Sequence, residues 1–453
     1  FVSIMKSAKQ IRLGLAGIIM ALAISGAHSA ERAPRPARDR PPNVVIILTD
    51  DQGYADIGAQ GAEGFQTPHL DRLAREGMRF TDFHVAAPVC SASRAALLTG
   101  CYPQRVGIPA VVSANATYGI NPDEKLLPEI LRERGYSTAV FGKWHLGHHH
   151  PTLPLQNGFD EFFGSQGSND MGPGRPTLEQ RRLGKAGVRL LEGNDIIEID
   201  PDQRLLTRRY TERAVDFIHR KRDRPFFLYV PHNMPHTPLF ASDAFAGGSK
   251  RGLYGDVIEE IDESVGQILE ALSTHGLERH TLVMFTSDNG PWLIFGDHGG
   301  SAKPLRGGKK QVWEGGLRVP CIMRWTGEIP ADSVCRELAT TMDILPTITG
   351  LVGGRLPGHG TDGQDIWPLL SGQADARSPH DAFYYYWQYE LHAVRSGDWK
   401  LILPHTDAQA PDPHGIGNGG IRGAVRKEKV DLALFDLKAD PGEKLDRSKQ
   451  RPE

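Results

Sequence analysis

One short segment of the chain combines a thiol, two hydroxyls and a guanidinium within five residues. Its order is Cys90-Ser91-Ala92-Ser93-Arg94. The residues that follow are rich in Ala and Leu and end at Gly100, which predicts a helix beginning at or just before Cys90. The free N–H groups and the dipole at a helix N-terminus favour an anionic side chain or ligand. Cys90 is therefore a candidate nucleophile; the alternative is a small buried cysteine without a chemical role.

Four apolar runs elsewhere in the chain end in polar or ionisable residues. The runs are residues 43–49, 137–141, 225–230 and 281–286. The residues that follow them are, in chain order, Asp50 and Asp51, Lys143 and His145, His232 and His236, and Asp288 and Asn289. Continuous apolar runs are typical of strands buried on both faces of a parallel sheet. Because ligands of open α/β sheets bind beyond the carboxyl ends of the strands, we expect one shared site at this edge.

The residue types at this edge predict a metal ion and an anionic substrate. The predicted metal ligands offer only oxygen atoms, which suits Ca²⁺ or Mg²⁺ better than zinc, and they are Asp50, Asp51, Asp288 and Asn289. Cationic side chains surround them: Arg94, Lys143, His145, His236 and Lys309. Such an array stabilises a tetrahedral oxyanion, sulfate or phosphate, whose charge shifts toward the leaving oxygen in the transition state.

Two motifs resemble those of the type I, formylglycine-dependent sulfatases, an arylsulfatase-like family. The first is Cys90-x-Ala-x-Arg94 followed by Leu97-Leu98-Thr99-Gly100, and the second is Gly142-Lys143-Trp144-His145-Leu146-Gly147. The resemblance extends from Asn43 to about Pro320. It implies an alkaline-phosphatase-like fold, a sulfuric ester hydrolase activity, and a maturation enzyme that oxidises Cys90 to Cα-formylglycine.

The resemblance also implies a role for each matching residue. Hydrated formylglycine at position 90 would coordinate the metal and attack sulfur, while Arg94 and His145 hold its hydroxyls. Lys143 and Lys309 would bind the sulfate oxygens. His236 is the expected general acid near the leaving oxygen and also contacts the substrate, and His232 is a weaker second candidate.

Two other classes of function remain open at this point. One is a phosphomonoesterase, phosphodiesterase or phosphonate hydrolase of the same superfamily, in which Asp297 and His298 would bind a second metal. Cys90 argues against it, because those relatives usually use Ser or Thr as the nucleophile. The other is a secreted carbohydrate-binding protein without catalysis. Secretion and the broad polar stretch between Ser165 and Gln203 favour a sulfated carbohydrate, with an aryl sulfate as the alternative substrate.

Composition and the N-terminal residues indicate a secreted or periplasmic globular protein. The chain has 453 residues and a formal net charge of −3, so no extended basic face for nucleic acid is expected. A basic segment, an apolar run at 13–24 and the small-x-small site at Ala27-His28-Ser29 predict a signal peptide over 1–30 and no membrane span in the mature chain. Oligomeric state is not readable from these features.

The predicted architecture is an α/β fold with a large mixed, mostly parallel sheet flanked by helices. A flexible spacer is expected at 31–42, a catalytic domain at 43–370, and a small antiparallel subdomain at 371–453 whose C-terminal end is expected to be truncated. The stretch between Ser165 and Gln203 shows little periodicity and is interpreted as an irregular insertion on the rim of the site. Cys321 and Cys335 could pair as a disulfide.

Overall fold

A computed structural model describes residues 40–173 and 176–451. The predicted signal peptide at 1–30 and residues 31–39 of the predicted spacer lie outside the described residues. None of the helices in the described part of the chain combines the length and the apolarity needed to cross a membrane.

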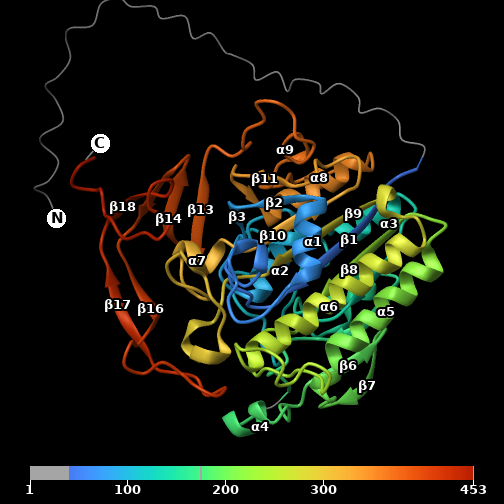
Figure 1. The fold of residues 1–453 in the computed structure, drawn as a ribbon, viewed down its shortest axis with the longest axis horizontal. Helices are drawn as coiled ribbons and strands as arrows, with labels where there is room; N and C mark the ends of the chain where they lie inside the picture. The colour runs from blue at the N-terminus through green and yellow to red at the C-terminus, as the bar shows by residue number, and fades with distance from the viewer. Residues whose placement is uncertain (1–39, 174–175, 452–453) are drawn as a thin grey trace, which may run out of the picture. The chain divides into compact units, whose positions relative to one another are not determined.

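A ten-stranded mixed sheet forms the centre of the fold (Figure 1). Its strands, in spatial order, are β11 (Ser333–Cys335), β2 (Met78–Phe80), β10 (Cys321–Arg324), β9 (Thr281–Ser287), β1 (Asn43–Thr49), β8 (Phe226–Pro231), β4 (Ser137–Phe141), β5 (Glu161–Ser165), β6 (Arg189–Glu192) and β7 (Asp195–Ile199). The five strands from β9 to β5 are parallel to one another, whereas β10, β6 and β7 each pair antiparallel with a neighbour. The predicted mixed, mostly parallel sheet is therefore confirmed.

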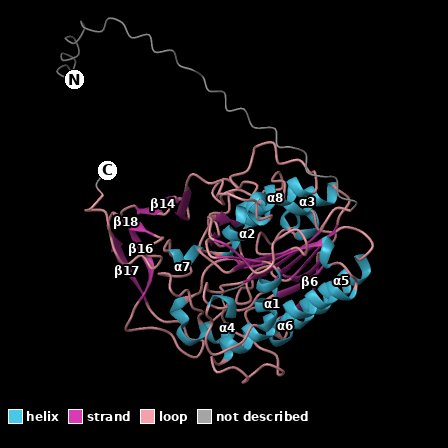
Figure 2. Ribbon diagram, turned by 45° about the horizontal axis from the view of Figure 1, so that its top comes forward, coloured by secondary structure: helices cyan, strands magenta, loops and turns pink. Residues whose placement is uncertain are grey.

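Helices cover both faces of this sheet (Figure 2). One face carries α1 (Pro68–Glu76), α5 (Leu206–Lys221) and α6 (Leu253–Thr274), and the other carries α2 (Cys90–Thr99), α3 (Leu127–Glu133) and α8 (Ile344–Leu351). The sequence of strand β1 is apolar because both faces of the strand are buried. Val45 and Ile47 belong to the core beneath α5 and α6, while Val44, Ile46 and Leu48 belong to the core on the opposite face.

Shorter elements connect or extend these layers. The remaining helices are α4 (Leu178–Arg182), α7 (Glu314–Leu317) and α9 (Trp367–Leu370), and a two-stranded sheet pairs β3 (Phe83–His84) with β12 (Ala339–Thr340). Single 3₁₀ turns are η1 (Gly58–Gln60), η2 (His150–Thr152), η3 (Pro154–Gln156), η4 (Gln203–Leu205), η5 (Glu278–His280) and η7 (Thr341–Asp343), and η6 (Leu293–His298) is longer.

The C-terminal part contains two antiparallel sheets. One matches the predicted antiparallel arrangement and consists of β13 (Phe383–Trp387), β14 (Glu390–Ser396), β15 (Trp399–Ile402) and β18 (Ala433–Asp436). A separate hairpin of β16 (His405–Pro411) and β17 (Val425–Val430), which the sequence analysis did not predict, lies between β15 and β18 in the chain. The domain boundary near residue 370 stays a prediction.

Two local expectations differ from the structure. The stretch after Ser165 is not irregular throughout, because β6 and β7 form a hairpin that extends the main sheet beyond β5. Cys321 and Cys335 are free and do not pair, since they lie on β10 and β11 on opposite sides of β2, each in register with Phe80.

Candidate active site

The four strands whose ends were predicted to share a site are direct neighbours in the sheet. Their order is β9, β1, β8 and β4, and all four run in the same direction. Their carboxyl ends consequently meet at one edge, where their polar residues enclose a buried centre. The shared edge predicted from the sequence is thus present in the fold.

Helix α2 presents Cys90 and Arg94 to this edge. Cys90 is its first residue, and Arg94 lies one turn later on the same face. Both are buried, and Cys90 lines a pocket of about 290 Å³. The Arg94 guanidinium donates to Oδ2 of Asp288 at 2.9 Å and to the carbonyl oxygen of Lys143 at 2.8 Å, so it joins helix α2 to the ends of β9 and β4.

Three carboxylates and one amide converge beside Cys90. One oxygen each of Asp50 and Asp288 and the sulfur of Cys90 lie within 4.8 Å of one another. Among the described residues, Oδ1 of Asp50 and Oδ1 of Asn289 are buried and have no hydrogen-bond partner, while Nδ2 of Asn289 donates to Asp51 at 2.7 Å. Buried oxygens without donors are costly unless a cation satisfies them. This donor set therefore fits a hard divalent cation such as Ca²⁺ or Mg²⁺.

Repulsion between the carboxylates and attraction to nearby cations shift their pKa values in opposite directions. Burial opposes ionisation of Asp50, but Lys143, His236 and Arg94 together lower its pKa well below the usual range. Burial and the charge of Asp50 instead raise the pKa of Asp288 to about 7. The raised pKa of Asp288 reflects burial and repulsion by Asp50, both of which a bound cation would offset.

Two buried lysines pair with these carboxylates. The Nζ atom of Lys143 donates to Oδ2 of Asp50. Nζ of Lys309 lies 2.6 Å and 2.8 Å from the two carboxylate oxygens of Asp51. Although burial opposes its charged form, Asp51 raises the pKa of Lys309, which keeps the ammonium ion protonated. Both lysines thus add positive charge where an anionic group would enter.

Two of the predicted histidines face the same pocket. His145 is fully buried, and neither of its ring nitrogens has a hydrogen-bond partner in the part of the chain that the structure describes. Burial, together with Lys143 and Arg94, lowers the pKa of His145 well below its usual value, so its ring is neutral. His236 lies opposite, where Nδ1 is 3.0 Å from Oδ1 of Asn169 and Nε2 is 3.7 Å from Oδ2 of Asp51.

Other sequence candidates lie away from the pocket. His232 packs toward the helices, with Nε2 3.4 Å from the Ser264 hydroxyl of α6, and burial lowers its pKa to about 4. Asp297 is exposed and accepts a hydrogen bond from the Gly419 N–H at 2.8 Å. His298 does not line the pocket either. The metal pair suggested for the phosphatase alternative is therefore not part of this centre.

Several pocket residues were missed by the sequence analysis. Ser168 lies 3.3 Å from Nδ1 of His236 and comes from the stretch interpreted as irregular. Trp292, in the loop after β9, has its ring centre 5.4 Å from that of His236. Lys310 places its ammonium 5.0 Å from the Trp292 ring centre. The position of Trp292 in the Gly-Pro-Trp segment, which follows the predicted metal ligands Asp288 and Asn289, could have indicated that it lies near the site.

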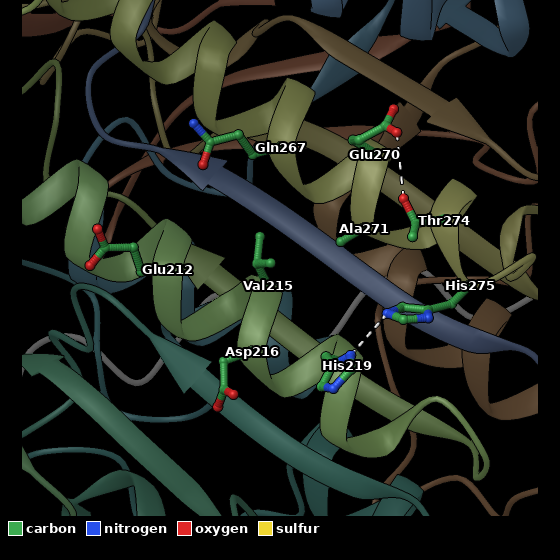
Figure 3. A pocket seen from close by; sticks show the side chains of 9 residues that line it. All are labelled: Glu212, Val215, Asp216, His219, Gln267, Glu270, Ala271, Thr274 and His275. Carbon is green, nitrogen blue, oxygen red and sulfur yellow. Dashed lines mark hydrogen bonds between the residues drawn. The ribbon is translucent and has the colours of Figure 1, made fainter.

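A separate groove lies between α5 and α6 (Figure 3). Its two histidines, His219 and His275, lie 3.3 Å apart near the C-terminal ends of these helices, which lead into the amino ends of β8 and β9. The groove is consequently at the opposite edge of the sheet from Cys90. Its remaining polar residues are exposed side chains of α5 and α6, and it contributes nothing to the centre described above.

The mixed, mostly parallel sheet with helices on both faces, and the site at the carboxyl ends of its strands, define a protein of the alkaline-phosphatase-like type. The "Sulfatase" family model matches residues 42–354, and the "N-sulphoglucosamine sulphohydrolase, C-terminal" model matches residues 307–410. The chain therefore belongs to the sulfatase family, whose members hydrolyse sulfate esters.

Individual relatives agree with this assignment. N-acetylgalactosamine-6-sulfatase of Mus musculus is 39% identical over 90% of this chain and 82% of its own length. Arylsulfatase A of Homo sapiens is 38% identical over 89% of this chain and 83% of its own. The crystal structure of the PsFucS1 sulfatase from Pseudoalteromonas sp. superposes with a TM-score of 0.78 and 28% identity, covering 90% of this chain and 86% of that one. The predicted enzyme class is thus confirmed.

Proposed function

We propose that this sulfatase uses an oxidised Cys90 and a divalent metal ion to hydrolyse sulfate esters of carbohydrates. The observation that carries the proposal is that the sulfur of Cys90 lies within 4.8 Å of carboxylate oxygens of Asp50 and Asp288, next to a pocket that Cys90 and the buried Lys309 line. Oxidation of Cys90 to formylglycine would supply a hydrated aldehyde as nucleophile at the first residue of α2. The N-terminus of that helix and the adjacent cations favour negative charge at this position.

The metal ion would be held by Asp50, Asp51, Asp288 and Asn289, with residue 90 as a further ligand. It would supply positive charge that polarises a sulfate oxygen. Arg94 would hold this centre in place, because it donates hydrogen bonds to the carboxylate of Asp288 and to the carbonyl oxygen of Lys143. Ca²⁺ and Mg²⁺ both suit these ligands.

The remaining polar residues act on the sulfate group and on protons. Lys143 and Lys309 would bind the sulfate oxygens and stabilise the charge that moves toward the leaving oxygen. His145, with two free ring nitrogens, would accept a proton from the hydroxyl at position 90. His236 would donate a proton to the leaving alcohol, and its contacts with Asn169 and Ser168 hold its ring in place.

The names of the relatives point to both carbohydrate and aryl sulfate substrates. The name N-acetylgalactosamine-6-sulfatase describes a sugar substrate, whereas the name arylsulfatase A does not. The pocket itself favours a sugar, because Trp292 offers an aromatic face beside His236 and polar groups surround it. The predicted secretion fits an enzyme that meets glycans outside the cytoplasm.

The proposal is tested by the mass of the tryptic peptide Phe80–Arg94, from protein produced together with a formylglycine-generating enzyme. We expect the Cys90 thiol to be replaced by an aldehyde and the purified protein to release inorganic sulfate from sulfated sugars. Cys90→Ala should abolish sulfate release. Cys101→Ala, at a buried cysteine outside the pocket, should retain it. An unmodified thiol, in a host that matures another sulfatase, would contradict the proposed nucleophile.

A further inference from the structure

A second hollow opens from the pocket that contains Cys90. It has a volume of about 670 Å³, and Trp292, Arg181, Asp170 and Pro176 line both spaces. Trp292 therefore stands between the reaction centre and the outer hollow. A substrate whose sulfate reaches Cys90 would extend its remaining part past this ring.

Most cations around the outer hollow are already paired with carboxylates. Nη1 of Arg181 lies 2.9 Å from Oδ2 of Asp170. Nε of Arg182 lies 3.1 Å from Oε2 of Glu179. These pairs contribute little net positive charge.

Two cations beside Trp292 differ from these pairs. Within residues 40–173 and 176–451, no carboxylate forms an ion pair with Lys310 or Arg422. Lys310 is half-buried above the Trp292 ring and lines the inner pocket, whereas Arg422 is exposed and lines the outer hollow. Because Trp292 lines both spaces, the two cations lie on either side of the passage from the inner pocket to the outer hollow. Burial, Lys309 and Arg422 each lower the pKa of Lys310.

The backbone around Arg422 is held against the loop that carries Trp292. The N–H groups of Gly417 and Gly423 both donate to the carbonyl oxygen of Ile294, at 3.0 Å and 2.7 Å. Gly296 permits this close approach, because it has a φ of 57° and an added Cβ would collide with the carbonyl oxygen of Gly417. Arg422 is thus fixed next to the site by a segment about 130 positions later in the chain than Trp292.

The backbone of Lys310 is also unusual. Its φ is 69°, a left-handed conformation that is strained for a residue other than glycine. Asp51 and His145, both in the reaction centre, share this feature with φ values of 67° and 63°. The N–H of Lys310 donates to the carbonyl oxygen of Pro88 at 2.8 Å, which ties it to the segment before Cys90. Such strain is common at residues that a functional site must position.

We propose that Lys310 and Arg422 form a second anion subsite, which binds an acidic group of the substrate next to the sulfate ester that is hydrolysed. The proposal rests on the proposed function and narrows its substrate class. The preferred substrate is a glycan with a sulfate or carboxylate group in addition to the reacting sulfate. These two cations can form charge-assisted hydrogen bonds with such an anion without first breaking an ion pair inside the protein.

The test compares two sugars that differ only in a second sulfate group. For each, kcat/KM is measured with wild-type enzyme, Arg422→Gln and Lys310→Gln. We expect the wild type to prefer the disulfated sugar, and each substitution to lower the ratio of the two kcat/KM values by about tenfold, the effect of losing one charge-assisted hydrogen bond. Arg422→Lys should keep most of the preference.

Arg182→Gln is the matched control, because it removes a cation of the same hollow that Glu179 already pairs. It should leave the ratio unchanged. An equal fall of both kcat/KM values in Arg422→Gln, or the same effect in Arg182→Gln, would overturn the subsite. If the wild type hydrolyses neither sugar, the proposed function fails separately. In that case, calorimetry would measure the affinity of the wild type and of Arg422→Gln for the disulfated sugar. We expect Arg422→Gln to weaken this binding about tenfold. An unchanged affinity would refute the subsite.

Discussion

Replacing Lys400 with methionine should leave two buried carboxylates without their shared cation. Nζ of Lys400 lies 3.1 Å from Oε1 of Glu314 and 2.8 Å from Oε1 of Glu443, and it also donates to the carbonyl oxygen of Val312 at 2.9 Å. The side chains of all three charged residues are fully buried. Because breaking a buried ion pair leaves an uncompensated charge, we expect Lys400→Met to lower the free energy of unfolding by about 3–5 kcal/mol.

The pH dependence of this loss follows from the two carboxyl groups. Burial raises the pKa of Glu443 to about 7 even though Lys400 opposes the shift. Burial also opposes ionisation of Glu314, but Lys400 and His84 together lower its pKa well below the usual value. Without Lys400 both pKa values must rise. A carboxyl group whose folded pKa exceeds its unfolded value supports folding below the unfolded pKa and loses that contribution as pH rises through the folded pKa. The deficit should therefore grow from about pH 5 to about pH 8.

Urea-induced unfolding of the wild type and Lys400→Met at these two pH values measures the effect. Lys429→Met is the matched control, because Lys429 pairs with Asp431 on the surface and both side chains are more than 80% exposed. Its cost should stay below about 1 kcal/mol. A Lys400→Met deficit as small as that of the control, or one that shrinks toward high pH, would refute the reasoning. The result also bears on the site, because Glu314 is the first residue of α7, shortly after Lys309 in the chain.

Three further outcomes are expected. Asp288→Asn weakens the metal centre and its contact with Arg94, so kcat/KM for sulfate release should fall by about 100-fold or more; near-normal turnover would contradict the assigned ligand. Chelation with EDTA should abolish sulfate release and added Ca²⁺ or Mg²⁺ should restore it, while activity unaffected by the chelator would remove the metal from the mechanism. Gly296→Ala should push the Gly417 segment away and raise KM more than it lowers kcat, since Arg422 would move but Cys90 would not; a loss confined to kcat would contradict this.

The sequence alone determined the parts of this protein that depend on local pattern. Apolar runs over 43–49 and 281–286 predicted buried parallel strands, which are β1 and β9 in the structure. The helix beginning at Cys90 was predicted because its start, its Ala- and Leu-rich body and Gly100 are contiguous in the chain. The shared edge followed from a general rule, since polar residues after parallel strands collect where those strands end.

The tertiary structure decided which of those side chains meet. His232 and His236 follow the same strand, yet His236 faces Asp51 and His232 faces Ser264, because the direction of each side chain depends on the turn after β8. Cys321 and Cys335 are both free, because β2 lies between their strands in the sheet. The spacing of the two cysteines along the chain does not reveal this strand order.

Contacts between distant segments were the least predictable feature. Ser168 reaches His236 from a stretch without a clear pattern, and Arg422 reaches the Trp292 loop from the hairpin of β16 and β17. Such contacts depend on how separate elements pack, and the free energy that fixes them comes from burial and hydrogen bonds between segments far apart in the chain. The sequence thus determined the residues available for chemistry, and packing determined which of them share one pocket.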